Sequence, residues 1–292
     1  MNAAEGNGVD GGTVVGVDAG ATLAKIAARR ADGQVQRRLL PARAAAEIEV
    51  AVAGLAPERV GLTGAGASAL VAALAARGLE TVQVNEFAAW GSGATALLAE
   101  GHDSGEAVDL DPYLLVSLGT GTSVMFSDGM AVSRIGGTAL GGGTVVGLGA
   151  LLLEPCGFAE IAALASRGDR RKVDLLVSDI YRPGEIPLAG DLTAASFGKL
   201  GRAAGDNPLP EDLAQAIMGL VGENVALICA GLGATRPVRR VVFAGSTLRQ
   251  NPALRDVLER ITGAFGLRVI FLAGGEFAGA LGALRLAAGD PD

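Results

Sequence analysis

The sequence predicts an α/β protein in which one βββαβαβα unit occurs twice, with an insertion in the second copy. Three observations lead to this prediction. PYLLVSLGTGTS at 112–123 repeats the pattern of TVVGVDAGATLAK at 13–25: an aliphatic run, a turn of small residues with Thr or Ser, and a second apolar run. Strand patterns then alternate with helical ones after each hairpin. Half of the 292 residues are hydrophobic and 45 are glycine, which is typical of compact chains with many tight turns.

The two hairpins resemble each other beyond their strands. Superposing them places Gly20 on Gly121 and Thr22 on Ser123, an offset of 101 residues, and Asp-Gly follows each hairpin. Backbone N–H groups and hydroxyls clustered in such a turn suit an anion such as phosphate, although an ordinary tight turn is the alternative for either hairpin alone. Together they predict a duplicated domain that closes on one nucleotide from both sides.

The elements of the first copy follow from periodicity and turn residues. We expect strands at 14–17, 25–28 and 34–39, a helix at 44–55, a strand at 59–63, a helix at 67–77, a strand at 81–84 and a helix at 87–99. The acidic loop at 103–111 then separates two predicted domains, 13–108 and 109–288.

The second copy begins with the same three strands and continues through an insertion. We expect strands at 113–118, 124–126 and 130–135, a glycine loop at 141–143, a helix at 146–153, and helical or nearly helical segments at 158–166 and 172–180. A loop at 183–190, a helix at 194–200 capped by Asp191, a long helix at 213–231, a strand at 238–244, a helix at 252–265, a strand at 269–272 and a helix at 277–287 are expected to follow. The apolar stretch 136–153 reaches membrane length, but its glycines and threonines favour a strand, loop and helix.

Composition and charge argue against several classes of protein. The net charge of −7 predicts no nucleic-acid partner. Residues 1–12 lack the basic start and apolar core of a signal peptide and are predicted to form a disordered tail, so we expect a cytoplasmic protein without a membrane segment. Cys156 and Cys229 have no metal-binding spacing and are predicted to be two buried thiols in a reducing compartment. His102, the single histidine, lies in a polar loop, which excludes a histidine-based zinc site.

Seven motifs along the chain point to one family. They are GVDAGATLAK at 16–25, NEF at 85–87, LGTGTS at 118–123, RIGGT at 134–138, GGG at 141–143 with GLG at 147–149, GDLTAASFG at 190–198, and FAGALGA at 277–283. In this order they resemble the type II pantothenate kinases, which belong to the actin, hexokinase and Hsp70 ATPase superfamily. The resemblance implies two ribonuclease H-like (actin-like ATPase) domains with a nucleotide cleft between them. It further implies ATP and Mg²⁺ as cofactors, pantothenate as the substrate, a homodimer, and CoA or an acyl-CoA as a possible further ligand.

Two departures from the family pattern bear on this resemblance. Ala21 stands where the family commonly has a second glycine, and a methyl group there restricts φ near the nucleotide. Trp90 and Ser92 lie in the helix after Glu86, where substrate-facing side chains could differ. Two alternatives to a pantothenate kinase therefore stay open: a kinase of the same fold acting on a sugar or another pantothenate-like alcohol, and a non-catalytic regulator that binds a nucleotide or acyl-CoA. Sugar kinases of this superfamily usually use an aspartate base, so Glu86 favours pantothenate.

Four charged residues are the candidates for the chemistry of phosphoryl transfer. Asp18 ends the first strand and could hold Mg²⁺ directly or through water; the alternative is a turn carboxylate. Lys25 could reach a phosphate, or could be a solvated strand lysine. Glu86 follows an apolar strand at its carboxyl end, where α/β sheets place ligands, and the matching family glutamate deprotonates pantothenate; the alternative is a carboxylate favoured by the helix dipole. Arg134 matches a family arginine that contacts pantothenate, or is a surface arginine.

The predicted nucleotide-binding residues come from five segments. They are Asp18, Ala19, Gly20, Ala21, Thr22 and Lys25 in the first hairpin, Gly119, Thr120, Gly121 and Thr122 in the second, Gly142, Gly143, Thr144, Val145 and Val146 at a helix start, Phe158 beside adenine, and Gly245 with Ser246 over the nucleoside. For Phe158, plain core packing is the alternative.

Overall fold

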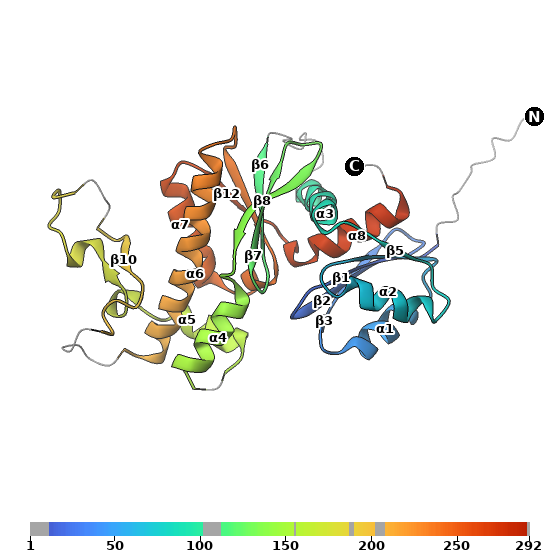
Figure 1. Ribbon diagram of the computed structural model, residues 1–292, viewed down its shortest axis with the longest axis horizontal. Helices are drawn as coiled ribbons and strands as arrows, with labels where there is room; N and C mark the ends of the chain where they lie inside the picture. Colours follow the sequence, from blue (N-terminus) through green and yellow to red (C-terminus); the bar gives the residue numbers. More distant parts are fainter. Residues whose placement is uncertain (1–11, 102–111, 155, 187–189, 202–207, 291–292) are drawn as a thin grey trace, which may run out of the picture. The chain divides into compact units, whose positions relative to one another are not determined.

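The computed structural model describes residues 12–101, 112–154, 156–186, 190–201 and 208–290. These residues form two five-stranded sheets, each with its own helices (Figure 1). Most of the predicted tail at 1–12, His102 and the predicted domain boundary at 108–109 lie outside the described residues.

The first sheet has the order β3-β2-β1-β4-β5. Its first three strands are antiparallel neighbours, whereas β4 is parallel to β1 and to β5. This follows from the connections, because tight turns join β1, β2 and β3 while helices lead into β4 and β5. The elements are β1 (Val14–Ala19), β2 (Leu23–Arg29), β3 (Val35–Pro41), α1 (Ala45–Ala53), β4 (Arg59–Thr63), α2 (Ala67–Ala75), β5 (Thr81–Gln83) and α3 (Glu86–Glu100).

The second sheet repeats this topology, with the order β12-β11-β6-β7-β8 and with β11 parallel to β6 and to β12. The predicted duplication is therefore confirmed. In chain order the second copy comprises β6 (Tyr113–Leu118), β7 (Thr122–Ser127), β8 (Val132–Thr138), α4 (Gly142–Leu152), α5 (Phe158–Ala165), α6 (Pro210–Gly233), β11 (Arg240–Ala244), α7 (Pro252–Ala264) and β12 (Arg268–Phe271), and the chain ends with α8 (Ala278–Ala288), which packs on elements of the first sheet.

Over the first two strands of each copy the structural offset is 99 residues, not the 101 inferred from the motifs. Val14 and Tyr113 begin β1 and β6, and Leu23 and Thr122 begin β2 and β7. Strand ends therefore pair Gly20 with Gly119. The motif alignment matched Gly20 to the second glycine of the Gly-Thr-Gly turn, because side-chain similarity in a turn of small residues does not specify the register.

The structure of the insertion differs from its prediction in two places. The segment 172–180, predicted to be helical or nearly so, lies between and includes parts of two 3₁₀ turns at Arg170–Lys172 and Val177–Asp179, with the strand β9 (Leu175–Leu176) between them. The helix predicted at 194–200 is wrong, because β10 (Thr193–Ala195) overlaps its start and pairs antiparallel with β9. The side chain of Asp174 accepts the Phe197 N–H at 2.8 Å, which joins the two segments. Asp191 forms an ion pair with Arg260 at 2.6 Å. Long-range pairing has overridden local helix propensity here.

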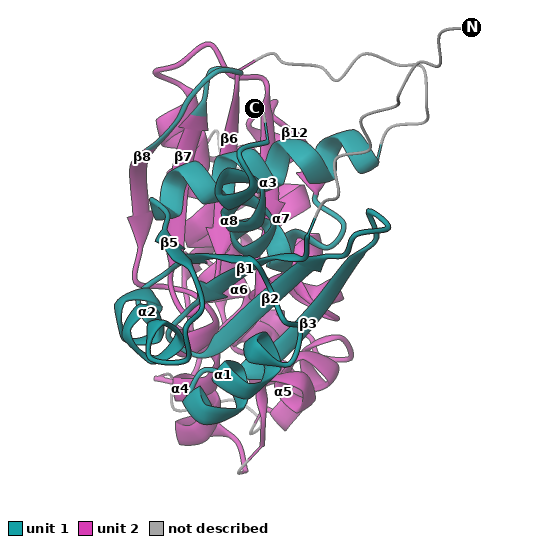
Figure 2. Ribbon diagram, turned by 90° about the vertical axis from the view of Figure 1, so that its right-hand side faces the viewer, with its two compact units in different colours: residues 1–110, 127–133, 272–292 teal, residues 111–126, 134–271 magenta. Residues whose placement is uncertain are grey.

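Chain contacts divide the protein into two compact units, coloured separately in Figure 2. Unit 1 comprises residues 1–110, 127–133 and 272–292, and unit 2 comprises 111–126 and 134–271. The predicted domain 109–288 differs from unit 2 because α8 and the β7–β8 turn belong to unit 1. Helix α8 packs on α3, β1 and β4, and a Cβ at Gly282 would overlap the Ala89 carbonyl. Glycine at this crossing lets the two helices approach closely.

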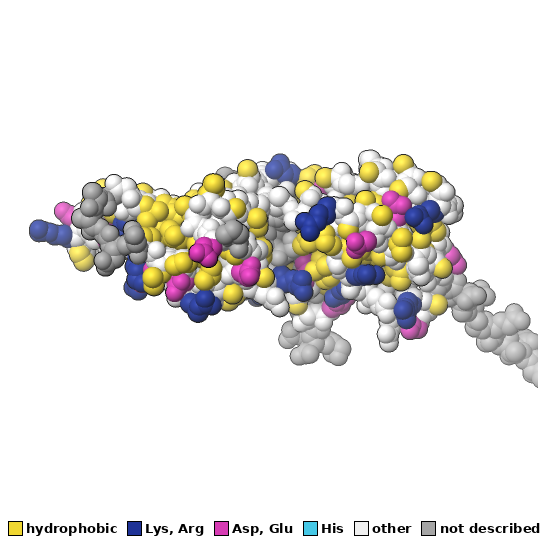
Figure 3. All heavy atoms as spheres, turned by 90° about the horizontal axis from the view of Figure 1, so that it is seen from below, with side chains coloured by type: hydrophobic (Ala, Val, Ile, Leu, Met, Phe, Trp, Pro, Cys, Tyr) yellow, Lys and Arg dark blue, Asp and Glu magenta, His cyan; other side chains and the backbone are white. Residues whose placement is uncertain are grey.

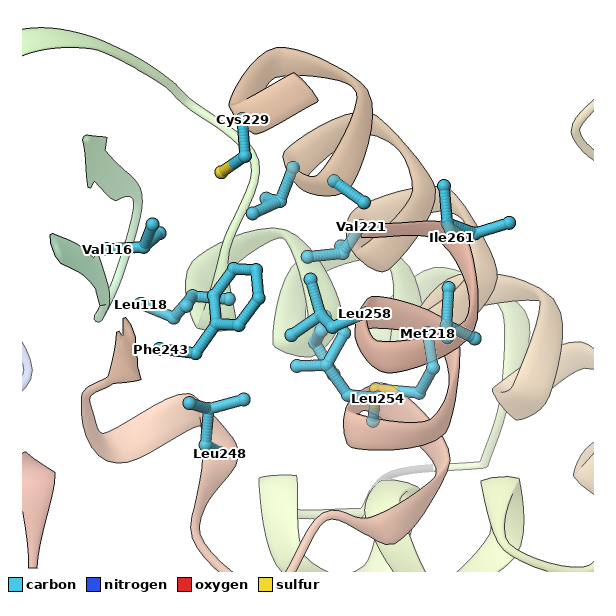
Figure 4. Close-up of a cluster of buried hydrophobic side chains, with 14 of the residues drawn as sticks. Val116, Leu118, Met218, Val221, Cys229, Phe243, Leu248, Leu254, Leu258 and Ile261 are labelled. Atoms are coloured by element: carbon cyan, nitrogen blue, oxygen red, sulfur yellow. The ribbon is translucent and has the colours of Figure 1, made fainter. Parts of the chain in front are cut away.

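The core of unit 2 lies between its sheet and helices α6 and α7 (Figure 4). Phe243 of β11 points towards Leu254 and Leu258 of α7. Helix α6 is long and apolar enough to cross a membrane, but 61% of its apolar window is buried in the protein, as in the core helix of a globular domain. The apolar residues on one face of α6 are thus buried in the core of unit 2.

The two cysteines differ in exposure. Cys229 of α6 is buried, and burial raises the pKa of its thiol to about 12. Cys156 is only half-buried, because it precedes α5 in a connection rather than lying within an element. The prediction of two buried thiols is therefore wrong for Cys156. Both cysteines are free.

Candidate functional site

Asp18 lies at the carboxyl end of β1, with its side chain enclosed by small residues. It is 4% exposed and lies opposite Thr63 of β4 in the parallel register. A Cβ at Gly64 would lie 2.7 Å from Asp18 Oδ1, and one at Gly279 of α8 would lie 3.0 Å from Oδ2. Gly64 also has a φ of +87°, which favours glycine. These two glycines leave the room that the carboxylate occupies.

Lys25 is paired with Asp18 inside unit 1. The two residues are opposite each other in the β1–β2 register, with Lys25 Nζ 3.2 Å from Asp18 Oδ2, and Lys25 is 8% exposed. Burial raises the pKa of Asp18, while the charge and hydrogen bond of Lys25 oppose that shift. The alternative of a solvated lysine is therefore ruled out, because Lys25 is the buried partner of this carboxylate.

Glu86 is the first residue of α3, and its position is set by a capped helix start. The Asn85 side chain accepts the N–H groups of Phe87 and Ala88 at 3.0 and 3.1 Å. Partial burial and the negative charge of Asp18 raise the pKa of Glu86, while Lys25 lowers it. Glu86, Asp18 and Lys25 thus form one electrostatically coupled group, although their sequence positions span the whole first copy.

The turn of the first hairpin lies between Asp18 and Lys25 in the sequence and is exposed at its tip. Ala21 and Thr22 are exposed, and Ala21 is not among the described non-glycine residues with positive φ, so its methyl group introduces no backbone strain. A Cβ at Gly20 would lie 3.1 Å from Lys25 Nζ. Glycine at position 20 therefore keeps the backbone close to the buried cation.

The second glycine turn in unit 2 is tied to the start of α4. The Gly119 N–H donates to the Gly121 carbonyl at 2.9 Å, the Gly142 N–H donates to the Gly119 carbonyl at 2.8 Å, and the Gly143 N–H donates to the Thr120 carbonyl at 2.9 Å. The Gly142 and Gly143 amides thus bind loop carbonyls. In a phosphate site, these two amides would therefore fix the conformation of the loop. The amino-terminal end of α4, where the helix dipole is positive, would add favourable electrostatics for an anion.

Hydroxyl groups complete this loop cluster at the carboxyl ends of β6 and β11. Thr122 Oγ1 donates to the Leu140 carbonyl at 2.7 Å, and Thr247 Oγ1 donates to the Gly119 carbonyl at 2.8 Å. Gly245, next to Ser246, has a φ of +112°, and a Cβ there would overlap the Leu118 carbonyl. Three segments that are distant in sequence therefore form one compact loop cluster.

The remaining predicted residues of unit 2 have different surroundings. Thr144 Oγ1 donates to the Ala139 carbonyl at 3.3 Å, the Val145 N–H donates to the Gly141 carbonyl at 3.1 Å, and Val146 is exposed on α4. Arg134 is exposed on β8, with Nε 3.5 Å from Ser123 Oγ. Phe158 packs against the unit 2 core, which fits the core-packing alternative.

Gly64, Gly279 and Thr247 contact the candidate site residues but were not predicted. The duplication contained a signal for Gly64, because Gly64 follows β4 as Gly245 follows β11, and both have positive φ. Gly279 and Thr247 carried no comparable signal. Their contacts depend on how α8 packs on β1 and on how the segment after β11 meets the glycine turn.

A magnesium ion is compatible with this donor set. The described residues contain no group of three His, Cys, Asp or Glu side chains placed to bind a metal. Magnesium is commonly held by only one or two carboxylates, with waters and substrate phosphates as its other ligands. Asp18 supplies one such carboxylate, and Gly64 and Gly279 leave room for its side chain. Elsewhere on the surface, basic and acidic side chains are interspersed over the face in Figure 3.

The sequence of this chain matches one family model and relatives that share one name. The family Fumble matches residues 58–286. A type II pantothenate kinase of Staphylococcus haemolyticus is 34% identical over 276 residues, covering 93% of this chain and 99% of that protein. A type II pantothenate kinase of Staphylococcus aureus is 34% identical over 281 residues, covering 93% and 98%.

Solved structures of lower identity share the fold. Component A of the (R)-2-hydroxyglutaryl-CoA dehydratase of Acidaminococcus fermentans superposes with a TM-score of 0.63 at 17% identity, covering 96% of this chain and 98% of that one. A ROK family glucokinase of Streptomyces griseus, in complex with glucose and AMPPNP, superposes with a TM-score of 0.58 at 16% identity, covering 94% and 99%. The predicted actin- and hexokinase-like ATPase fold is thereby confirmed.

Proposed function

Because this chain belongs to the type II pantothenate kinase family, we propose that it transfers the γ-phosphoryl group of ATP to pantothenate and forms 4′-phosphopantothenate and ADP. This is the first step of coenzyme A synthesis. The observation that carries the proposal is the coupled group of Asp18, Lys25 and Glu86. Asp18 lies near the carboxyl end of β1, Lys25 lies opposite it on β2, and Glu86 begins the helix that follows β5. It combines a metal-binding carboxylate, a cation and a second carboxylate of raised pKa, which are the groups that phosphoryl transfer requires.

Glu86 is the proposed general base. As the new bond forms between the pantothenate hydroxyl oxygen and the γ-phosphorus, the bond from that phosphorus to the β,γ-bridging oxygen breaks, and the hydroxyl proton passes to the Glu86 carboxylate. Its raised pKa brings Glu86 closer to the working pH, where a general base is most efficient. Arg134 is proposed to contact pantothenate and to stabilise negative charge.

Asp18 is the proposed ligand of magnesium, which when bound neutralises phosphate charge. Lys25 holds the Asp18 side chain in place and supplies positive charge beside the first turn. The glycine turn at 119–122, the start of α4, and Gly245 with Ser246 are proposed to bind the nucleotide in unit 2. The hydrogen bond from Thr247 Oγ1 to the Gly119 carbonyl helps to fix the conformation of this glycine turn.

We further propose a homodimer and CoA or an acyl-CoA as a further ligand, both on the basis of family membership. A cytoplasmic location and the absence of a nucleic-acid partner are proposed from the cysteine pattern and the net charge of −7. The two ATPase domains are proposed to correspond to 13–108 and 109–288, since the sheets repeat one topology. The apolar face of α6 gives no support to dimerisation, because Ile217, Met218 and Val221 are buried in the core of unit 2.

The test is a measurement of ADP release from Mg-ATP with pantothenate, a hexose and a panel of other alcohols, with mass spectrometry of the product. We expect ADP release with pantothenate and a product carrying one added phosphoryl group. Background release with pantothenate but turnover with a hexose would assign the chain to sugar phosphorylation. ATP binding without turnover on any alcohol would support a non-catalytic regulator.

A further inference from the structure

Unit 1 contains a cavity whose lining includes none of the residues assigned to phosphoryl transfer. The cavity has a volume of about 300 Å³ and lies between α3, α8 and the β7–β8 turn. Ser92 and Thr95 come from α3, Ser127 and Val132 from the β7–β8 turn and its flanking strand ends, and Arg285 from α8. Ser92 is one of the positions at which the sequence predicted a departure from its family.

One wall of this cavity is polar and firmly positioned. Ser92 is 9% exposed, and its Oγ accepts a hydrogen bond from Arg285 Nε at 3.1 Å. This bond joins α3 to α8 and orients the guanidinium group at the cavity wall. Thr95 and the buried Ser127 add two further hydroxyl groups to the lining. A planar guanidinium with neighbouring hydroxyls matches the two oxygens of a carboxylate.

Other residues of the lining are apolar. Met130 is 92% exposed and borders the cavity with Val132 and Leu286. Methionine side chains adapt to the shape of a ligand, and an exposed methionine beside a cavity supplies an apolar wall. The volume is at the lower end of the range of small-molecule sites, so only a compact ligand fits.

We propose that this cavity binds a small organic acid. The ligand's carboxylate would contact Arg285 and Ser92, and its short aliphatic chain would lie against Met130 and Val132. The site is separate from the proposed catalytic group, so occupation of the cavity does not require ATP or pantothenate.

The experiment uses hexanoate as the probe and the full-length protein, with binding followed by calorimetry or ligand-observed NMR. Hexanamide tests the need for the carboxylate, and inorganic phosphate tests the need for the aliphatic chain. Arg285→Gln removes the cation, and Arg30→Gln is the matched control, because Arg30 is an exposed arginine of the same unit. Ala131→Phe fills the cavity from the exposed turn without changing charge. Circular dichroism verifies that each variant is folded.

We expect saturable hexanoate binding that weakens about tenfold or more in Arg285→Gln and Ala131→Phe and is retained in Arg30→Gln, as loss of a charge-assisted hydrogen bond predicts. Hexanamide and phosphate should bind at least about tenfold more weakly than hexanoate. No saturation in the millimolar range, unchanged binding in both cavity variants, equal binding of phosphate, or displacement of hexanoate by pantothenate would each overturn the proposal.

Discussion

Asp18 and Lys25 form an ion pair that is nearly excluded from solvent, and Glu86 is coupled to both charges. Removing one partner of a buried pair leaves the other charge uncompensated, which makes such pairs sensitive to mutation. A substitution that removes the charge of Asp18 in β1 or of Lys25 in β2 is therefore expected to destabilise unit 1. Glu86, which is exposed at a helix start, can be changed with less structural risk.

Replacing Glu86 by glutamine is expected to cut turnover about 10²–10⁴-fold, the usual contribution of a general base. The amide has nearly the same shape as the carboxylate and cannot accept the hydroxyl proton. ATP affinity should stay unchanged, since Glu86 is not among the proposed nucleotide contacts. Steady-state kinetics and calorimetry measure the two effects. Near-normal turnover of the variant would remove Glu86 from the mechanism.

The titration of Glu86 is expected to respond oppositely to its two charged neighbours. Asp18 raises its pKa, so Asp18→Asn should shift the titration midpoint down, whereas Lys25 lowers it, so Lys25→Met should shift the midpoint up. In the unmodified protein the raised pKa means that turnover is lost at a higher pH than an ordinary glutamate would produce, as acidification protonates the base. Carboxyl ¹³C NMR follows the midpoint, with Arg30→Gln as the control. Identical midpoints in all four proteins would contradict the coupling.

Two kinds of element contact shape the candidate site: the glycine turn tied to α4, and the close crossing of α3 and α8. In the first, backbone amides and threonine hydroxyls hold the loop carbonyls. In the second, glycine lets helix backbones approach, and α8 brings Gly279 against Asp18. Both depend on the absence of side chains at specific positions.

Gly121→Val is expected to abolish ATP binding. A Cβ at Gly121 would already lie 3.3 Å from the Thr138 carbonyl, so a branched side chain would crowd the glycine turn that is proposed to bind the phosphates. Ala21→Gly is the control in the first turn and should retain or increase activity, because Ala21 is exposed and unstrained. Calorimetry that gave Gly121→Val the affinity of the unmodified protein would refute the second phosphate loop.

Replacing two helical glycines by alanine is expected to change the free energy of unfolding in opposite directions. At Gly282 of α8, the added Cβ would overlap the Ala89 carbonyl, and overpacking of this kind destabilises by about 1–3 kcal/mol. At Gly231 of α6, an added Cβ would meet no heavy atom within 4 Å, so alanine should stabilise by roughly 0.5–1 kcal/mol through its higher helix propensity. Urea denaturation measures both changes. A stable Gly282→Ala variant would show that the crossing has room to adjust.

At the scale of the whole molecule, one sheet topology occurs twice, and the second copy adds an insertion and a 24-residue helix. The insertion is anchored to this helix by a buried cluster in which Arg170 pairs with Glu223 and lies 3.7 Å from Asp174. A Cβ at Gly219 would collide with the Arg170 side chain. The added segment is therefore held by charge pairing as well as by apolar packing.

The protein is expected to be a homodimer, on the basis of family membership. Light scattering at micromolar concentration should give about twice the chain mass of 29.1 kDa. The apolar face of α6 should have no part in the interface, so exposed charges introduced next to that buried stripe should leave the mass unchanged. A mass equal to that of one chain would refute the dimer.

The sequence by itself determined the α/β class, the duplication, most elements and the family, because strand and helix periodicity, turn residues and ordered motifs are local properties of the chain. The tertiary structure alone decided that Lys25 is buried against Asp18, that the insertion pairs as β9 and β10, and that α8 belongs with unit 1. It also showed that the Gly142 and Gly143 amides bind loop carbonyls. Each of these outcomes depends on contacts between segments distant in sequence. Local propensity cannot predict them, because the free energy of burial and pairing is gained only when the segments meet.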